Sequence, residues 1–214
     1  MFKRKAAVAA VIPAFLLISG CAGEGQITDQ GVIAVRSACP TVAIPAATGD
    51  VTLFNPETSR DARAIDVVAD ITNVRSTCDE TGANLASTVT FDVQAQRRDT
   101  RGARDVVIPY FAVVVQGGTV IQSKSISRVG LHFADGQARA ETRGTASATI
   151  NRAAATLPAD IRTQITRTRK PGDPDAAVDP MSDPKVREAV QRVSFEVLVG
   201  FQLTPEQLAY NATR

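Results

Sequence analysis

Residues 89–96 read Val-Thr-Phe-Asp-Val-Gln-Ala-Gln, with an apolar side chain at every odd position and a polar one at every even position. Successive side chains of a β-strand point to opposite faces of its sheet, so one face of this segment is apolar and the other polar. A helix would scatter the same residues around its circumference. The segment therefore predicts a strand with one buried face.

The same period of two recurs on both sides of this segment. In residues 65–71 every odd position is apolar, while Asp66 and Asp70 lie on the opposite face. In residues 193–203 the odd positions carry only valine, phenylalanine and leucine. Both segments predict further half-buried strands.

Residues 106–115 are apolar on both faces, which is typical of a central strand. Pro109 has no amide donor for a sheet ladder, which indicates a bulge or an edge start at that position. Residues 116–119 read Gln-Gly-Gly-Thr and predict a tight hairpin, because glycine accepts the positive φ angles of such a turn. Asp135-Gly136 gives a second turn signal.

With two short apolar segments before residue 55, the chain holds about seven to nine strands, separated by turns at the spacing of a β-sandwich. We therefore expect an all-β fold. At the level of pattern it resembles immunoglobulin-like or fibronectin-III-like sandwiches, although it lacks tryptophan altogether. Short helical segments are predicted near 152–166, 184–192 and 205–210. Residues 167–184 hold four prolines among charged residues and predict an exposed loop.

The chain begins with a positive cluster, Lys3-Arg4-Lys5, and an apolar run from Ala6 to Ile18 that only Pro13 interrupts. Such a run is too short to span a bilayer, which needs about 20 residues, and has the length of a signal-peptide core. It ends in Leu17-Ile18-Ser19-Gly20-Cys21, which resembles the lipobox of bacterial lipoproteins. The resemblance implies a signal peptide over 1–20 and an acylated Cys21. The alternative is an ordinary secretory signal with a chance cysteine.

If this resemblance holds, acyl chains on Cys21 attach the protein to a membrane after it has met the lipoprotein-processing and sorting machinery. Ala22 stands where lipoproteins retained in the inner membrane often carry aspartate, which favours the outer membrane, with the protein facing the periplasm. Residues 21–31 are then a lipid-anchored tether, and 32–211 form the sandwich domain.

The formal net charge of +2 comes from 24 Lys and Arg against 22 Asp and Glu. Removing residues 1–20 takes away three positive charges and leaves 21 against 22, or −1. Aromatic residues make up only 5% of the chain. A near-neutral domain with few aromatic residues does not predict a nucleic-acid partner.

Cys39 and Cys78 remain once Cys21 is acylated, an even number in an oxidising compartment, so we expect them to form a disulfide. The alternative is two separately buried thiols. The single histidine, His132, occurs without any Gly-x-Ser-x-Gly motif. We expect no catalytic residues, no cofactor and no metal site.

Two groups of carboxylates are candidates for chemistry. Asp66 and Asp70 share a strand face, but four residues of strand separate their backbones by about 13 Å, too far for a retaining glycosidase pair. The aspartates of the proline-rich loop lack the central glycine and closing glutamate of an EF-hand. These four are Asp173, Asp175, Asp179 and Asp183.

The densest basic stretch contains Arg97, Arg98, Arg101 and Arg104 between two predicted strands. As a hairpin tip it could bind phosphate of lipid head groups or lipopolysaccharide through guanidinium groups. The alternative is a solvated loop. Two further contact candidates are the 167–184 loop and the terminal segment that contains Thr204 and Tyr210.

Four short motifs resemble a group of small, uncharacterised proteobacterial envelope lipoproteins. They are Cys39-Pro40, Pro109-Tyr110-Phe111, Gly200-Phe201-Gln202-Leu203-Thr204 and Leu208-Ala209-Tyr210-Asn211. We expect a non-enzymatic, lipid-anchored envelope protein that makes a structural or assembly contact with another envelope protein. The alternative is a periplasmic carrier or sensor that holds a small apolar ligand, suggested by the doubly apolar strand 106–115.

Overall fold

The computed structural model describes residues 25–28, 31–34 and 37–213. The chain divides into two units, Met1–Val35 and Arg36–Arg214. In the first unit, β1 (Gly25–Thr28) pairs antiparallel with β2 (Gly31–Ala34). Strand β1 thus lies within the segment that we expected to be a tether. The predicted signal peptide and Cys21 lie outside the described residues.

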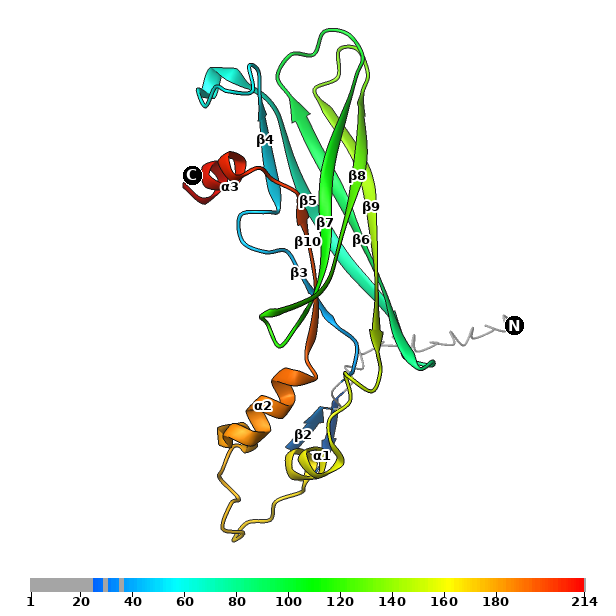
Figure 1. Cartoon of the computed structure of the whole chain (residues 1–214), viewed down its shortest axis with the longest axis vertical. Helices are drawn as coiled ribbons and strands as arrows, with labels where there is room; N and C mark the ends of the chain where they lie inside the picture. The colour runs from blue at the N-terminus through cyan, green and yellow to red at the C-terminus, as the bar shows by residue number, and fades with distance from the viewer. Residues whose placement is uncertain (1–24, 29–30, 35–36, 214) are drawn as a thin grey trace, which may run out of the picture. The chain divides into compact units, whose positions relative to one another are not determined.

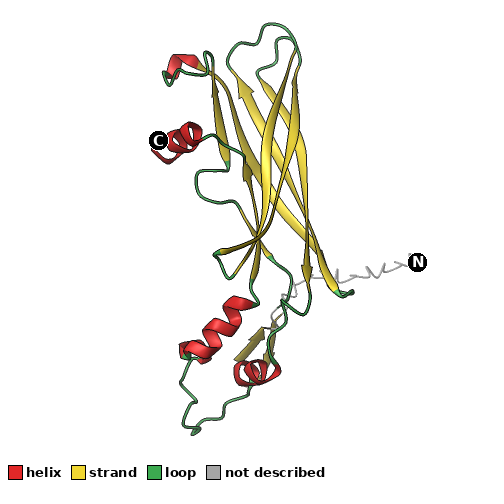
Figure 2. Cartoon of the chain, viewed as in Figure 1, coloured by secondary structure: helices red, strands yellow, loops and turns green. Residues whose placement is uncertain are grey.

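The second unit is a sandwich of two four-stranded sheets (Figures 1 and 2). The first sheet has the order β3 (Thr41–Ala43), β10 (Phe195–Phe201), β7 (Arg104–Gln116), β8 (Val120–Phe133). The second has the order β4 (Asp50–Phe54), β5 (Ile65–Asp79), β6 (Asn84–Arg97), β9 (Arg139–Asn151). Only β3 and β10 run parallel, and every other pair in the two sheets is antiparallel. The all-β sandwich prediction is confirmed.

The core lies between the sheets and is built from alternate residues of their strands. In β6 the odd-numbered residues Val89, Phe91 and Val93 are buried, as the period of two predicted. The ring of Phe91 meets that of Tyr110 edge-on, with 5.1 Å between centroids. The Tyr110 hydroxyl donates a 2.7 Å hydrogen bond to the carbonyl oxygen of Thr145, so the one polar atom of this ring is satisfied.

Of the two alternatives expected at Pro109, the bulge lies elsewhere in β7, whereas an edge start fits, because β10 pairs with β7 only from Tyr110 onward. The register between β7 and β8 shifts between Val114 and Val115. Pairing with β10 ends at Tyr110, and the Pro109 carbonyl then accepts a 2.9 Å hydrogen bond from the amide of Gln202. Since the N–H and C=O of a strand residue point to the same side, the missing Pro109 donor faces Gln202, one residue beyond the paired positions of β10. Pro109 therefore costs at most one hydrogen bond, at the end of this strand pair.

The connections between strands are of two kinds. Gly117 and Gly118 have φ angles of 62° and 77°, and they form the predicted hairpin between β7 and β8. Residues 98–103 instead connect β6 of the second sheet to β7 of the first. The prediction that the arginine stretch forms a hairpin tip is therefore wrong. Its residues cross between the sheets at one end of the sandwich (Figure 1).

Three α-helices and two 3₁₀ turns occur among the described residues. They are α1 (Ala159–Thr166), α2 (Pro184–Arg192), α3 (Pro205–Thr213), η1 (Ala62–Ala64) and η2 (Pro180–Ser182). The helices match the predicted segments, except that residues 152–156 form turns. None of the described helices combines the length and apolar character needed to cross a membrane.

Candidate functional site

Arg97 is the buried member of the arginine stretch, with only 2% of its surface exposed. Its guanidinium donates four hydrogen bonds of 2.8–2.9 Å to carbonyl oxygens in the two connections at this end of the sandwich. The acceptors are Gln137, Gly102, Thr100 and Ala134. Four of its five N–H groups thus donate to protein carbonyl oxygens, and the buried side chain is not presented to solvent for the expected phosphate contact.

The other three arginines differ in how accessible they are. Arg104 in β7 binds the Asp66 carboxylate of β5 at 3.1 Å, and this half-buried ion pair links the two sheets. Arg98 is exposed and donates a 2.6 Å hydrogen bond to the Arg63 carbonyl oxygen. Arg101 is 89% exposed, and its hydrogen bonds to Asp99 lower the pKa of that carboxyl. Of these four arginines, only Arg98 and Arg101 present guanidinium groups to solvent, and Asp99 neutralises the charge of Arg101.

The C-terminal segment closes over the edge strand β4. Thr204 and Gln207 form a capping box, with reciprocal backbone-to-side-chain hydrogen bonds of 2.9 and 3.2 Å. The Tyr210 ring meets Phe54 of β4 edge-on, 5.2 Å between centroids. Asn211 donates hydrogen bonds to the carbonyl oxygens of Ala47 and Asp50. The structure therefore places Tyr210 against the sandwich, while Thr204 stays exposed.

A cleft of about 760 Å³ opens at this same edge, between β4 and the start of β7. Apolar side chains form one part of its lining: Val51, Leu53, Phe54, Val107, Ile108 and Pro109. Polar and charged side chains form another part: Glu57, Thr58, Arg60, Asp66, Gln202, Thr204, Glu206 and Gln207. An apolar ligand would contact the apolar part of this lining, although polar and charged residues make up more than half of it, unlike the predominantly apolar lining of most small-molecule sites.

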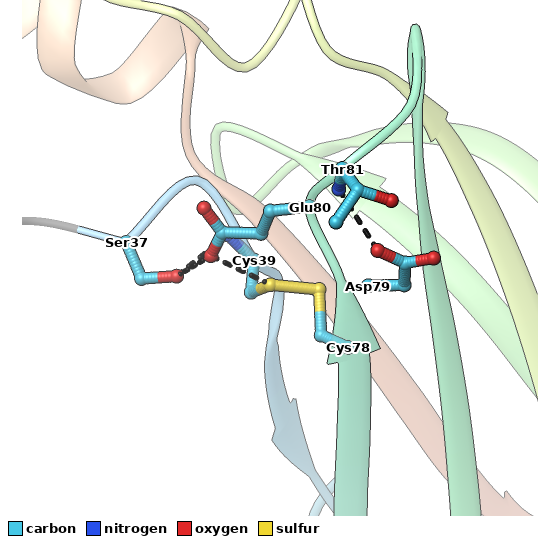
Figure 3. The surroundings of a disulfide bond; sticks show 6 residues. All are labelled: Ser37, Cys39, Cys78, Asp79, Glu80 and Thr81. Atoms are coloured by element: carbon cyan, nitrogen blue, oxygen red, sulfur yellow. Dashed lines mark hydrogen bonds between the residues drawn. A yellow bond between two sulfur atoms is a disulfide. The ribbon is translucent and has the colours of Figure 1, made fainter.

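Cys39 and Cys78 form the predicted disulfide, with Cα atoms 6.1 Å apart (Figure 3). The bond joins the start of the second unit to β5. Glu80 Oε1 accepts a hydrogen bond from the Ser37 hydroxyl and lies 3.0 Å from Cys39 Sγ. The disulfide sulfur carries no proton, so this second approach is a close polar contact. Among the described residues, these two cysteines and Glu80 are the one group that brings three metal-ligating side chains together, and both cysteines are bonded to each other.

His132 pairs with Asp105 across β7 and β8, with 2.7 Å between Nδ1 and Oδ1. Both side chains are largely exposed at the end of the sheet. Asp66 and Asp70 have separate environments: Asp66 binds Arg104, while Asp70 lies opposite Asp50 of β4 in the strand register. Asp66 and Asp70 therefore do not form the two-carboxylate pair of a glycosidase.

Each of the four aspartates of the 167–184 loop accepts hydrogen bonds from other groups of the protein. Asp175 pairs with Arg167 and Arg169, and the hydrogen bond from Arg167 is the main cause of its lowered pKa. Asp173 accepts the amide of Lys170. The remaining two cap the helical segments η2 and α2: Asp179 and Asp183. These contacts organise the loop.

The sequence patterns did not single out the outer edge of β8. Residues 120–128 of this strand are all exposed, and Ile121 and Ile126 have 65% and 59% of their surface in solvent. Val107 of the neighbouring strand is 58% exposed. The signal in the sequence is residues 120–128, Val-Ile-Gln-Ser-Lys-Ser-Ile-Ser-Arg. This segment contains two isoleucines but lacks the apolar residue at every second position that marks the core strands.

Comparisons of the chain with protein-family models, with curated proteins and with solved structures found no match in any of the three. The class is therefore defined by the fold and its sites alone. The chain contains a disulfide-bonded β-sandwich with a cleft at one sheet edge and an exposed strand at another.

Proposed function

We propose that the chain is a non-enzymatic, lipid-anchored protein of the bacterial cell envelope, with a structural or assembly role carried by its β-sandwich. The observation that carries the proposal is the Cys39–Cys78 disulfide. Structural disulfides persist in oxidising compartments such as the bacterial periplasm and are rare in the cytosol. The lipobox ending at Cys21 supplies the attachment, and Ala22 favours the outer membrane.

The non-enzymatic part of the proposal rests on chemistry-bearing residues. The single histidine contacts an exposed aspartate, and the sequence contains no nucleophile elbow. Asp66 and Asp175 bind arginines, which is a structural use of a carboxylate. Asp179 and Asp183 cap backbone amides, which is another. The partner is an envelope protein, and the acyl chains on Cys21 contact the membrane.

Metabolic labelling with radioactive palmitate tests the attachment. The full chain, expressed in a bacterial host, is expected to take up label and to sediment with the outer membrane. Cys21→Ser should abolish labelling and release the protein into the periplasmic fraction. The matched control, Cys39→Ser with Cys78→Ser, should remain labelled. A wild-type chain that is secreted without label would overturn the proposal.

The cleft beside Thr204 favours a second candidate, a periplasmic carrier or sensor of a small apolar ligand. Native mass spectrometry of the full chain purified from cells should then show a bound ligand. Thr58→Trp, at the exposed rim of the cleft, should remove it. Lys185→Trp, on α2, is the matched control and should keep it. A wild-type chain that carries no ligand argues against this candidate.

A further inference from the structure

Strand β8 forms one edge of the first sheet, and its residues 120–128 are exposed. One side of β8 pairs with β7, and no described strand pairs with its other side. The outer side of an edge strand presents N–H and C=O groups that can bind a further strand. Nine residues of strand extend about 30 Å, so the exposed segment could pair along a whole strand of a partner.

The side chains that flank this edge are partly apolar. The register places Ile126 opposite Phe111, which alternates along β7 with the core residues Tyr110 and Ala112 and so faces away from the core. Ile121 lies on that same face, because it is paired with Val115 beyond the register shift. More than half the surface of each isoleucine is in solvent. A strand added at this edge would cover both.

The charge of this edge has one sign. Residues 120–131 contain Lys124 and Arg128 and no acidic residue. Lys124 Nζ lies 5.4 Å from the centroid of the Phe111 ring, which holds the ammonium on the apolar face. Among the described residues, neither Lys124 nor Arg128 has an ion-pair partner. Opposite charges directly across a strand pair stabilise it.

We propose that the outer edge of β8, residues 120–128, binds an extended segment of a partner protein that carries apolar and acidic side chains in turn on one of its faces, because Ile121, Lys124, Ile126 and Arg128 share one face of the sheet. Main-chain hydrogen bonds provide the pairing, Ile121 and Ile126 receive the apolar side chains, and Lys124 and Arg128 select the acidic ones. This rests on the proposed structural or assembly role and names the surface that makes the contact.

A second copy of the chain fits this edge less well. Two copies of β8 would bring four cations into one interface without an acidic residue from either strand. In the registers that place Lys124 across from itself or from Arg128, like charges would also lie directly opposite, which destabilises a strand pair. An acidic segment removes both penalties.

Hydrogen exchange on the full chain, with a synthetic nine-residue peptide as the probe, tests the proposal. The peptide Ser-Val-Ser-Glu-Ser-Val-Ser-Glu-Ser, which places valine and glutamate on one face, should slow amide exchange in residues 120–128, whereas the same peptide with lysine in place of glutamate should not. Lys124→Glu with Arg128→Glu should weaken binding of the glutamate peptide about tenfold, since two attractive pairs become repulsive. Lys170→Glu with Lys185→Glu changes the net charge equally at exposed sites elsewhere and should leave binding unchanged.

Three results would overturn the proposal. The first is the absence of protection in β8 at millimolar glutamate peptide. The second is equal binding of both peptides. The third is concentration-dependent protection of β8 without any peptide, which would show that a second copy covers the edge. None of these results affects palmitate labelling, so failure of this proposal and failure of the proposed lipid attachment can be told apart.

Discussion

The guanidinium of Arg97, at the end of β6, lies over the ring of Phe133, at the end of β8, with 5.3 Å between Cζ and the ring centroid. These strands belong to different sheets. The four carbonyl oxygens that Arg97 binds come from the 98–103 and 134–138 connections. One side chain thus ties together both crossings at this end of the sandwich.

Arg97→Ala should lower the free energy of unfolding by about 3 kcal/mol or more, because it leaves buried carbonyl oxygens without donors. Arg97→Lys should recover less than half of this loss, since an ammonium cannot reproduce the planar fork of a guanidinium. Urea unfolding followed by circular dichroism measures both. Arg101→Ala, at an exposed position in the same connection, should change stability by less than about 0.5 kcal/mol. Equal effects at the two positions would contradict this role for Arg97.

The arginine stretch shows what sequence reasoning could and could not predict. The alternation in residues 89–96 fixes which side chains of β6 face the core, because a strand has only two faces. It does not fix which sheet the next strand joins, since a hairpin and a crossing to the other sheet both need a short polar connection. Arg97 follows the same odd-position pattern as Val93 and Ala95 and is buried with them. Because arginine is charged, the pattern of apolar residues at odd positions ends at Ala95, although the buried face continues to Arg97.

The disulfide and the capping box were predictable for a different reason. Cys39 and Cys78 are the two thiols that acylation of Cys21 would leave, and the Thr204 capping box is a local motif that needs no tertiary information. The cleft and the exposed edge of β8 depend on which strands form the edges of the two sheets and on what covers those edges. The sequence of one strand does not carry that information.

Gly144→Ala should destabilise the protein by about 1–3 kcal/mol through overpacking. Gly144 is paired with Phe91, and an added Cβ would lie 2.2 Å from the ring of that phenylalanine. Gly130→Ala is the matched control in a strand of the other sheet, because an added Cβ there meets nothing within 4 Å. Thermal unfolding should give a lower midpoint for the first variant and an unchanged or higher one for the second. A neutral Gly144→Ala would show that the Phe91 ring can move away.

Reduction of the Cys39–Cys78 bond should cost up to about 4 kcal/mol, because the cross-link closes a loop between residues 39 apart in sequence. The double variant Cys39→Ala, Cys78→Ala should unfold at a correspondingly lower urea concentration. Added dithiothreitol should lower the midpoint of the wild-type chain toward that of the variant and leave the variant itself unchanged. A reductant effect on the variant would show that the loss has another origin.

Asp70→Asn should stabilise the protein at neutral pH. Burial raises the pKa of the Asp70 carboxyl above its usual value of 3.8, and Asp50 lies directly opposite in the strand register. An acid with a raised folded pKa binds its proton more readily in the folded state, so its charged form opposes folding. The gain should stay below about 1 kcal/mol, since solvent screens a partly exposed charge. Urea unfolding at pH 7 measures it.

The pH dependence of these effects provides the sharper test. The gain from Asp70→Asn should be complete above the folded pKa of Asp70, shrink as the pH falls through it, and vanish below about 3.8, where both states are protonated. Asp79, on the same strand, has its pKa lowered by hydrogen bonds from Thr81. Asp79→Asn should therefore lose stability at pH 7, and that loss should fade as the pH drops through its lowered folded pKa. If both variants shift stability in the same direction at pH 7, the pKa of Asp70 is not raised while that of Asp79 is lowered, and the prediction is contradicted.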